Sequence, residues 1–144
     1  MSSSRVSRDQ LFMNIAFMMS ERATCKRLSV GAVLVKDKRT VGCGYNGTPP
    51  EEKHCSDEQC DMTKSCKISI HAEENLIAFS AKHGISTRGT KIYVTHEPCR
   101  GCAELIIQAG ITEVIFAIKY GEGSVGLLKR RNVLVKQFEG EIPV

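Results

Sequence analysis

The chain has 144 residues, of which 42% are hydrophobic and 25% are charged, with a formal net charge of +4 at pH 7. This length and apolar content suit a single domain, 1–144, and no run approaches the roughly 18 apolar residues that a membrane span needs. Residues 1–10 also lack the apolar stretch of a secretory signal, so we expect a cytoplasmic protein with no membrane partner.

The seven cysteines are an odd number in a chain expected to occupy a reducing compartment. Such a compartment disfavours disulfides, so clustered thiols favour metal binding over cystine pairing. The basic residues are scattered in short groups and do not gather on one periodic face. This distribution fits small anionic ligands at least as well as nucleic acid.

The first half of the chain predicts a helix, a hairpin and an irregular loop. Apolar residues recur at helical spacing within 7–23, and Ser7 followed by Gln10 resembles a capping box. Residues 30–47 form two β-rich runs around a polar Lys-Asp-Lys-Arg turn, which predicts an antiparallel hairpin with Cys43 in the core. Residues 48–68 are polar and contain several cysteines, so we expect a loop ordered by something other than a core.

The second half alternates between helix and strand. Helix 70–83 is expected to end near Gly84, strand 91–96 follows, helix 99–109 ends at Gly110, and strand 113–120 comes next. Residues 121–140 fit a short helix and a last strand. The prediction is an α/β or α+β layered domain, with a mixed sheet of about five strands and helices on both faces.

Cys99 and Cys102 stand three positions apart, directly after Pro98, at the predicted start of a helix. At 3.6 residues per turn they lie on one face of that helix, about 60° apart, where both can bind one ion. The positive end of the helix dipole favours the thiolate, which is the form that binds zinc. The pair alone leaves open a redox motif or half of a structural zinc site.

His71, at the start of the other predicted helix, supplies a third ligand, and Glu73 follows two residues later. Three protein ligands leave a tetrahedral zinc one position for water, which is the arrangement of a catalytic site. A carboxylate near the metal but not bound to it suits general acid–base catalysis. The combination of H-x-E with P-C-x-x-C is the signature of the zinc nucleobase deaminases.

A wider resemblance extends over nearly the whole chain. It is carried by the segments SRDQLFMNIAF, RATCKRLSVGAVLVKDKR, GYNGTPPEEKHC, HAEEN and YVTHEPCRGCAELIIQAGITEVIF. These segments are similar to the deoxycytidylate (dCMP) deaminases of the zinc-dependent cytidine deaminase superfamily. The resemblance implies a three-layer α-β-α fold and a usually hexameric hydrolase that converts dCMP to dUMP and ammonia ahead of thymidylate synthesis.

The same resemblance implies roles for individual residues. His71, Cys99 and Cys102 would hold the catalytic zinc, which activates water for attack at C4 of cytosine. Glu73 would carry protons to N3 and to the leaving amine.

Further roles concern the substrate and the regulation of the enzyme. The resemblance implies that Asn46 bonds the sugar hydroxyl, although asparagine before glycine is also typical of a turn. The segment Gly44, Tyr45, Asn46 and Gly47 resembles one near an allosteric site, where dCTP with magnesium activates and dTTP inhibits. Glycine there would let the backbone approach a triphosphate.

For the nucleotide phosphate we favour Arg22 and Tyr120, a cation and a hydroxyl donor near segment ends. Arg22 fits the exposed end of the first helix equally well.

A second, structural zinc would order the irregular loop. The candidate ligands are Cys25, Cys55, Cys60 and Cys66, with His54 as an alternative. Some dCMP deaminases carry such a zinc on cysteines that match Cys25 and Cys55. Free thiols around a loop are the other interpretation.

Two classes of alternative function stay open. Zinc deaminases that act on tRNA adenosine, cytosine or cytidine would share the same four site residues, although an aromatic content of 6% argues against RNA stacking. A non-catalytic zinc module would instead close its metal site with a fourth protein ligand.

Overall fold

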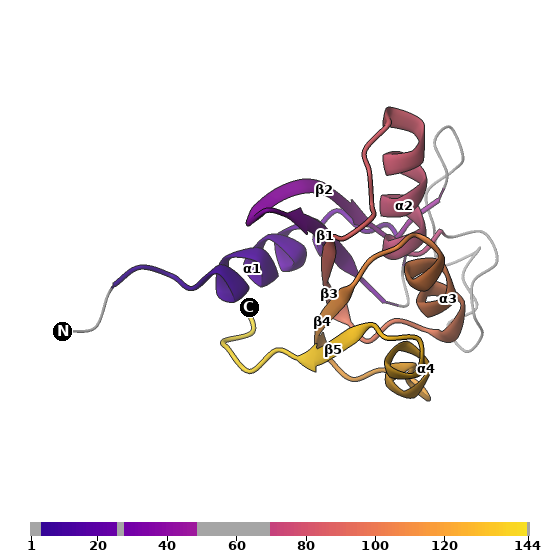
Figure 1. Ribbon diagram of the computed structural model, residues 1–144. Helices are drawn as coiled ribbons and strands as arrows, with labels where there is room; N and C mark the ends of the chain where they lie inside the picture. Colours follow the sequence, from indigo (N-terminus) through magenta and orange to yellow (C-terminus); the bar gives the residue numbers. More distant parts are fainter. Residues whose placement is uncertain (1–3, 26–27, 49–69, 144) are drawn as a thin grey trace.

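The computed structural model of the chain describes residues 4–25, 28–48 and 70–143. These residues form a five-stranded sheet with helices on both faces (Figure 1), which confirms the predicted layered α/β fold. The strands are β1 (Gly31–Lys36), β2 (Arg39–Tyr45), β3 (Lys91–His96), β4 (Glu113–Ile118) and β5 (Leu134–Gln137). The helices are α1 (Arg8–Ser20), α2 (Ala72–His83), α3 (Arg100–Gln108) and α4 (Val125–Arg130). Within the described ranges, every helix is too short or too polar to traverse a bilayer.

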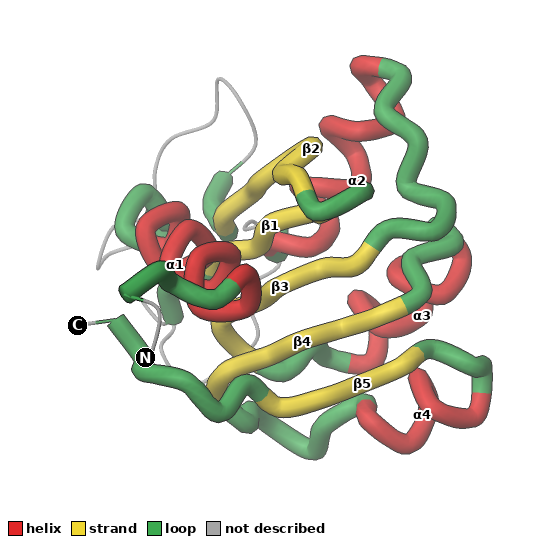
Figure 2. Tube along the Cα trace, turned by 60° about the vertical axis from the view of Figure 1, so that its left-hand side comes forward, coloured by secondary structure: helices red, strands yellow, loops and turns green. Residues whose placement is uncertain are grey.

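The strands lie in the order β2-β1-β3-β4-β5, which Figure 2 shows from the side of α1. Strand β1 is antiparallel to both β2 and β3, whereas β3, β4 and β5 are parallel to one another. The predicted hairpin is therefore confirmed. Its two turn residues, Asp37 and Lys38, have positive φ angles of 50° and 66°, as the tight turn between twisted strands requires, although neither is glycine.

The sheet separates two apolar layers because successive side chains of a strand point to opposite faces. In β1, Val33 and Val35 pack with Phe12 and Met13 of α1 on one face. Leu34 lies on the other face, in a larger cluster that includes residues of α2, α3 and α4. Within the described residues, α1 thus covers one face of the sheet, and α2, α3 and α4 cover the other (Figures 1 and 2).

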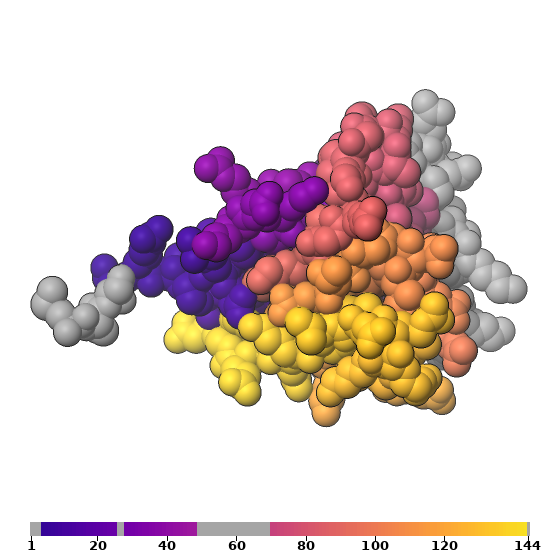
Figure 3. Space-filling view, in the orientation of Figure 1, coloured from indigo at the N-terminus to yellow at the C-terminus, as the bar shows by residue number. Residues whose placement is uncertain are grey.

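Helix α1 begins where its cap residue predicts, since the Ser7 hydroxyl accepts a hydrogen bond from the Gln10 backbone N–H at 3.1 Å. The Gln10 side chain makes different contacts from those of a capping box. Its amide donates to the Glu141 carbonyl at 2.7 Å and accepts from the Glu141 N–H at 3.0 Å. These bonds hold the C-terminal segment beside α1, and the two are adjacent at the surface in Figure 3.

The prediction that Cys43 belongs to the core is wrong, because its side chain is exposed. Its neighbours Gly42 and Gly44 face Leu76 of helix α2. The alternation of the strand therefore turns Cys43 to the opposite face. Strand β2 is the edge of the sheet, where solvent reaches that face.

Candidate active site

The topology brings the starts of α2 and α3 to the same end of the sheet, where strands β2 and β3 finish. Strands β2 and β3 run in the same direction, because each is antiparallel to β1. Just beyond β2, Gly47 and Ile70 exchange backbone hydrogen bonds of 3.1 and 2.7 Å, which places the next residue, His71, beside the end of that strand. Cys99 follows β3 by three residues and caps α3.

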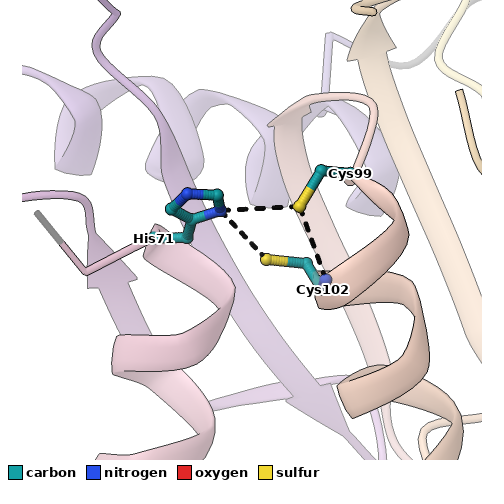
Figure 4. A group of neighbouring side chains, drawn as sticks. All are labelled: His71, Cys99 and Cys102. Carbon is teal, nitrogen blue, oxygen red and sulfur yellow. Dashed lines mark hydrogen bonds between the residues drawn. The ribbon is translucent and has the colours of Figure 1, made fainter. Parts of the chain in front are cut away.

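The predicted ligands meet at these two helix starts (Figure 4). His71 Nδ1 lies 3.3 Å from Cys102 Sγ and 3.6 Å from Cys99 Sγ, and all three donor atoms lie within 4.8 Å of one another. A tetrahedral zinc, with bonds of about 2.0–2.1 Å to nitrogen and about 2.3 Å to sulfur, holds such atoms about 3.6 Å apart. One nitrogen and two sulfur donors at this spacing fit zinc.

The electrostatics of the three predicted ligands favour a thiolate at Cys99. Hydrogen bonds with Cys102 and His71 lower the pKa of Cys99 to about 3. The Cys102 N–H, in the first turn of α3, donates to Cys99 Sγ at 3.5 Å, as expected for a thiolate at a helix start. The hydrogen bond to Cys99 in turn raises the pKa of His71 to about 9. The hydrogen bond to Cys99 and burial raise the pKa of the Cys102 thiol.

The two consecutive carboxylates of α2 have different surroundings. Glu73 is only 4% exposed, and its burial raises its pKa to about 7. Glu74 is more exposed, and its Oε1 accepts the His71 backbone N–H at 2.8 Å. Glu74 thus caps the helix, whereas Glu73 is a buried carboxyl that can exchange a proton near neutral pH.

The amide of Asn46 holds the chain before β1. Its Oδ1 accepts from the Val30 N–H at 2.8 Å, and its Nδ2 donates to the Leu28 carbonyl at 2.6 Å. Asn46 is 7% exposed, so it is a buried residue that fixes the backbone and not an ordinary turn residue.

The GYNG segment packs closely against its protein neighbours. A Cβ atom on Gly44 would lie 2.9 Å from the Ala72 carbonyl oxygen, so its lack of a side chain lets α2 approach β2. A Cβ atom on Gly47 would lie closest to the hydroxyl oxygen of Thr24. The carbonyl of Tyr45 accepts from Asn75 Nδ2 at 3.0 Å, a second link between β2 and α2.

The two residues predicted to meet the phosphate lie in different places. Tyr120 follows β4, is 37% exposed, and stands edge-on to His96 with ring centroids 6.1 Å apart. It lines a cavity of about 920 Å³ that also reaches Cys99. Arg22 is exposed just after α1 and is not part of the wall of this cavity.

The candidate ligands of a second zinc fall mostly outside the described residues. Cys25 is a half-buried free thiol, whereas His54, Cys55, Cys60 and Cys66 lie in the part of the chain that is not described. The second zinc therefore stays a prediction.

Glu97 and Ser124 were not predicted from the sequence. Glu97 is a 7% exposed carboxylate between β3 and Pro98, and it accepts a hydrogen bond from the Ser124 N–H at 2.9 Å. An acidic residue directly before Pro-Cys was the one available signal for this contact.

Comparison with known proteins agrees with this geometry. Residues 6–118 match the family model described as the cytidine and deoxycytidylate deaminase zinc-binding region. The chain belongs to this family. The family match and the cluster of His71, Cys99 and Cys102 confirm the prediction that the protein is a zinc-dependent hydrolytic deaminase.

Individual relatives extend over most of the chain. ComE operon protein 2 of Bacillus subtilis (strain 168) is 44% identical over 138 residues, which cover 94% of this chain and 73% of the relative. The deoxycytidylate deaminase of Mycobacterium phage D29 is 35% identical over 127 residues, covering 78% of this chain and 96% of the phage protein.

A solved structure shares the fold closely. The dCMP deaminase of cyanophage S-TIM5, in complex with dCMP and dUMP, superposes with a TM-score of 0.85 at 28% identity. The match covers 94% of this chain and 100% of the cyanophage chain, and it confirms the predicted cytidine-deaminase-like fold.

Proposed function

We propose that this deaminase hydrolyses dCMP to dUMP and ammonia. The observation that carries the proposal is the meeting of His71 Nδ1 with two thiol sulfurs at zinc-like spacing, beside a buried carboxyl. Two comparisons support the choice of substrate: the phage relative is a deoxycytidylate deaminase, and the similar cyanophage enzyme was solved with dCMP and dUMP.

The residues of the chain divide the chemical work. His71, Cys99 and Cys102 would hold the zinc, which would supply Lewis-acid activation of water. Glu73, with its pKa raised to about 7, takes one proton from the attacking water and delivers it to N3 of the base, and then takes the second proton of that water and delivers it to the departing amine. Because Glu73 is almost fully buried, bulk solvent does not compete for that proton.

The proposed nucleotide contacts are Tyr120, Arg22 and Asn46. Tyr120 lies on the wall of the cavity that reaches Cys99, so we assign its hydroxyl to the phosphate side of the substrate. Arg22 and Asn46 are retained as phosphate and sugar contacts. In the assigned complex, Asn46 adds the sugar contact to the two hydrogen bonds that it makes with residues 28 and 30.

The regulatory part of the proposal rests on the resemblance of the GYNG segment to an effector region. We assign activation by dCTP with magnesium and inhibition by dTTP to Gly44, Tyr45, Asn46 and Gly47. The assembly would be a cytoplasmic hexamer of single-domain chains that supplies dUMP for thymidylate synthesis.

The test is ammonia release by the purified, zinc-loaded chain. It should be measured side by side on dCMP, CMP, deoxycytidine and an RNA hairpin, each with and without dCTP and magnesium. We expect dCMP to be the preferred substrate and dCTP to raise its turnover. Preference for deoxycytidine or the hairpin would contradict the proposed substrate, and a lack of activity on all four would contradict the proposed function.

A further inference from the structure

A buried carboxylate outside the proposed chemistry stands two residues before the metal ligand Cys99. Glu97 is 7% exposed, and its Oε2 accepts a hydrogen bond from the Ser124 backbone N–H at 2.9 Å. A carboxylate that accepts an N–H forms a stronger hydrogen bond than a neutral acceptor does. Burying a charge is costly unless its contacts compensate, so the position of Glu97 calls for a reason.

Two more hydrogen bonds join the same two segments. The Ser124 hydroxyl donates to the Pro98 carbonyl at 2.7 Å, and the Glu97 N–H donates to the Ile118 carbonyl at 2.8 Å. Ser124 is 4% exposed, so these bonds are shielded from water. The segment that ends in Cys99 is therefore fastened to both ends of the connection between β4 and α4, at Ile118 and at Ser124.

Gly123 fits this contact through both its conformation and its size. Its φ angle is +77°, in the left-handed region that side chains other than glycine rarely adopt. A Cβ atom there would lie 3.0 Å from the carboxyl carbon of Glu97 and still closer to its Oε2. The backbone of the connection thus packs directly on the carboxylate.

The fastened connection lines a cavity that reaches the metal ligand Cys99. Residues 119–124, which include Tyr120, line the cavity of about 920 Å³ together with Glu97 and Cys99. Any shift of this connection would move the wall of the cavity relative to the metal ligands.

We propose that Glu97 is a positioning residue, which acts through Ser124 to hold residues 119–124 against Cys99 and thereby sets the affinity for the nucleotide. This inference rests on the proposed function, since the ligand it concerns is the proposed product or substrate. It assigns Glu97 no part in proton transfer.

The test uses the zinc-loaded full chain and three variants. Glu97→Ala removes the acceptor, Glu97→Gln keeps an acceptor oxygen without the charge, and Glu139→Gln makes the same chemical change at an exposed carboxylate outside the cavity. The measurements are hydrogen exchange at the Ser124 amide, the dissociation constant of dUMP by calorimetry, and zinc content.

We expect Glu97→Ala to speed Ser124 exchange and to weaken dUMP binding, each by about tenfold or more, the loss expected for a hydrogen bond to a charged group. Glu97→Gln should fall between Glu97→Ala and the wild type, and Glu139→Gln should match the wild type. Zinc content should be the same in all four proteins, because none of the three ligands is changed.

Ser124→Ala provides a second route, because it removes only the bond to Pro98 and keeps the N–H that Glu97 accepts. We expect a smaller change of the same kind, which applies even if Glu97→Ala fails to fold.

Two results would overturn the inference alone. Unchanged Ser124 exchange in the Glu97 variants would show that the carboxylate holds nothing in place. Faster exchange with unchanged dUMP affinity would reduce Glu97 to a structural residue. Failure of the wild-type protein to bind dUMP is a distinct result, which would contradict the proposed function and this inference together.

Discussion

The two faces of the sheet use the same strands for different purposes. On one face, α1 packs against the sheet through its side, with Phe12 and Met13 in the apolar layer. On the other face, α2 and α3 also bury apolar residues, but their starts converge so that His71 and Cys99 meet. The comparison shows that helix sides supply stability here, whereas helix starts supply the chemistry.

The largest expected difference between the faces comes from Glu73→Gln. Loss of the proton carrier should lower kcat for dCMP by about 10²–10⁴-fold, the usual contribution of general acid–base catalysis. Zinc should stay bound, because the three ligand side chains are unchanged. Steady-state kinetics and elemental analysis check both points. The matched control is Glu104→Gln on the exposed side of α3, which should keep wild-type activity. Near-normal deamination by Glu73→Gln would refute the role assigned to Glu73.

Two cavity-forming substitutions compare the faces directly. Leu76 in α2 and Met13 in α1 are both fully buried, so changing either to alanine should lower the free energy of unfolding by about 2–5 kcal/mol. Only Leu76→Ala should also lower kcat/KM in the folded protein, because it loosens the helix that begins at His71. Urea denaturation and kinetics well below the unfolding midpoint separate the two effects. An equal loss of kcat/KM in Met13→Ala would remove the distinction between the faces.

A smaller effect is expected at the cap of α2. Glu74→Ala removes the acceptor of the His71 N–H and should lower the free energy of unfolding by about 0.5–2 kcal/mol, as the loss of a cap does. Because the cap also orients His71, zinc affinity should fall as well. Competition with a chromophoric chelator measures that affinity. An unchanged zinc affinity would mean that α3 alone orders the site.

The smallest expected effect is a pH dependence on the α1 face. Partial burial opposes ionisation of Asp9, but hydrogen bonds from Lys136 and Tyr93 outweigh it and lower the pKa of the carboxyl. A carboxyl with a lowered pKa in the folded state stabilises the protein above its unfolded value of 3.8, and this stability is lost as pH falls through the folded pKa.

Asp9→Asn should therefore lower the free energy of unfolding at pH 7 by about 1 kcal/mol, since the contact is partly exposed to solvent. The difference from the wild type should shrink as the pH falls below 3.8. Urea midpoints over a pH series measure this trend. A difference that is constant with pH would exclude the carboxylate as its source.

Local sequence signals predicted the helix starts of the site well. Cys99 and His71 occupy cap positions next to residues that mark helix starts, and the spacing of Cys99 and Cys102 follows from helix geometry alone. The alternation of strands and helices predicted the order of β3, α3 and β4, and their bounds to within a few residues.

Contacts between segments far apart in the chain could not be predicted from the sequence. The error at Cys43 arose because an apolar strand does not reveal which of its faces a helix covers. Glu97 meets Ser124 across 27 residues, and Asn46 bonds residues 28 and 30, without any periodic pattern that links the partners. Such contacts depend on tertiary packing and leave no local trace.

Gly44 has a mechanical consequence for the metal centre. Since α2 touches the backbone of an edge strand there, a side chain at this position would push the helix outward as a rigid rod. The imidazole at its tip would travel with it and leave the two sulfurs, which belong to another helix. The distances from the His71 imidazole to the two cysteine sulfurs therefore depend, in part, on the absence of a side chain at Gly44.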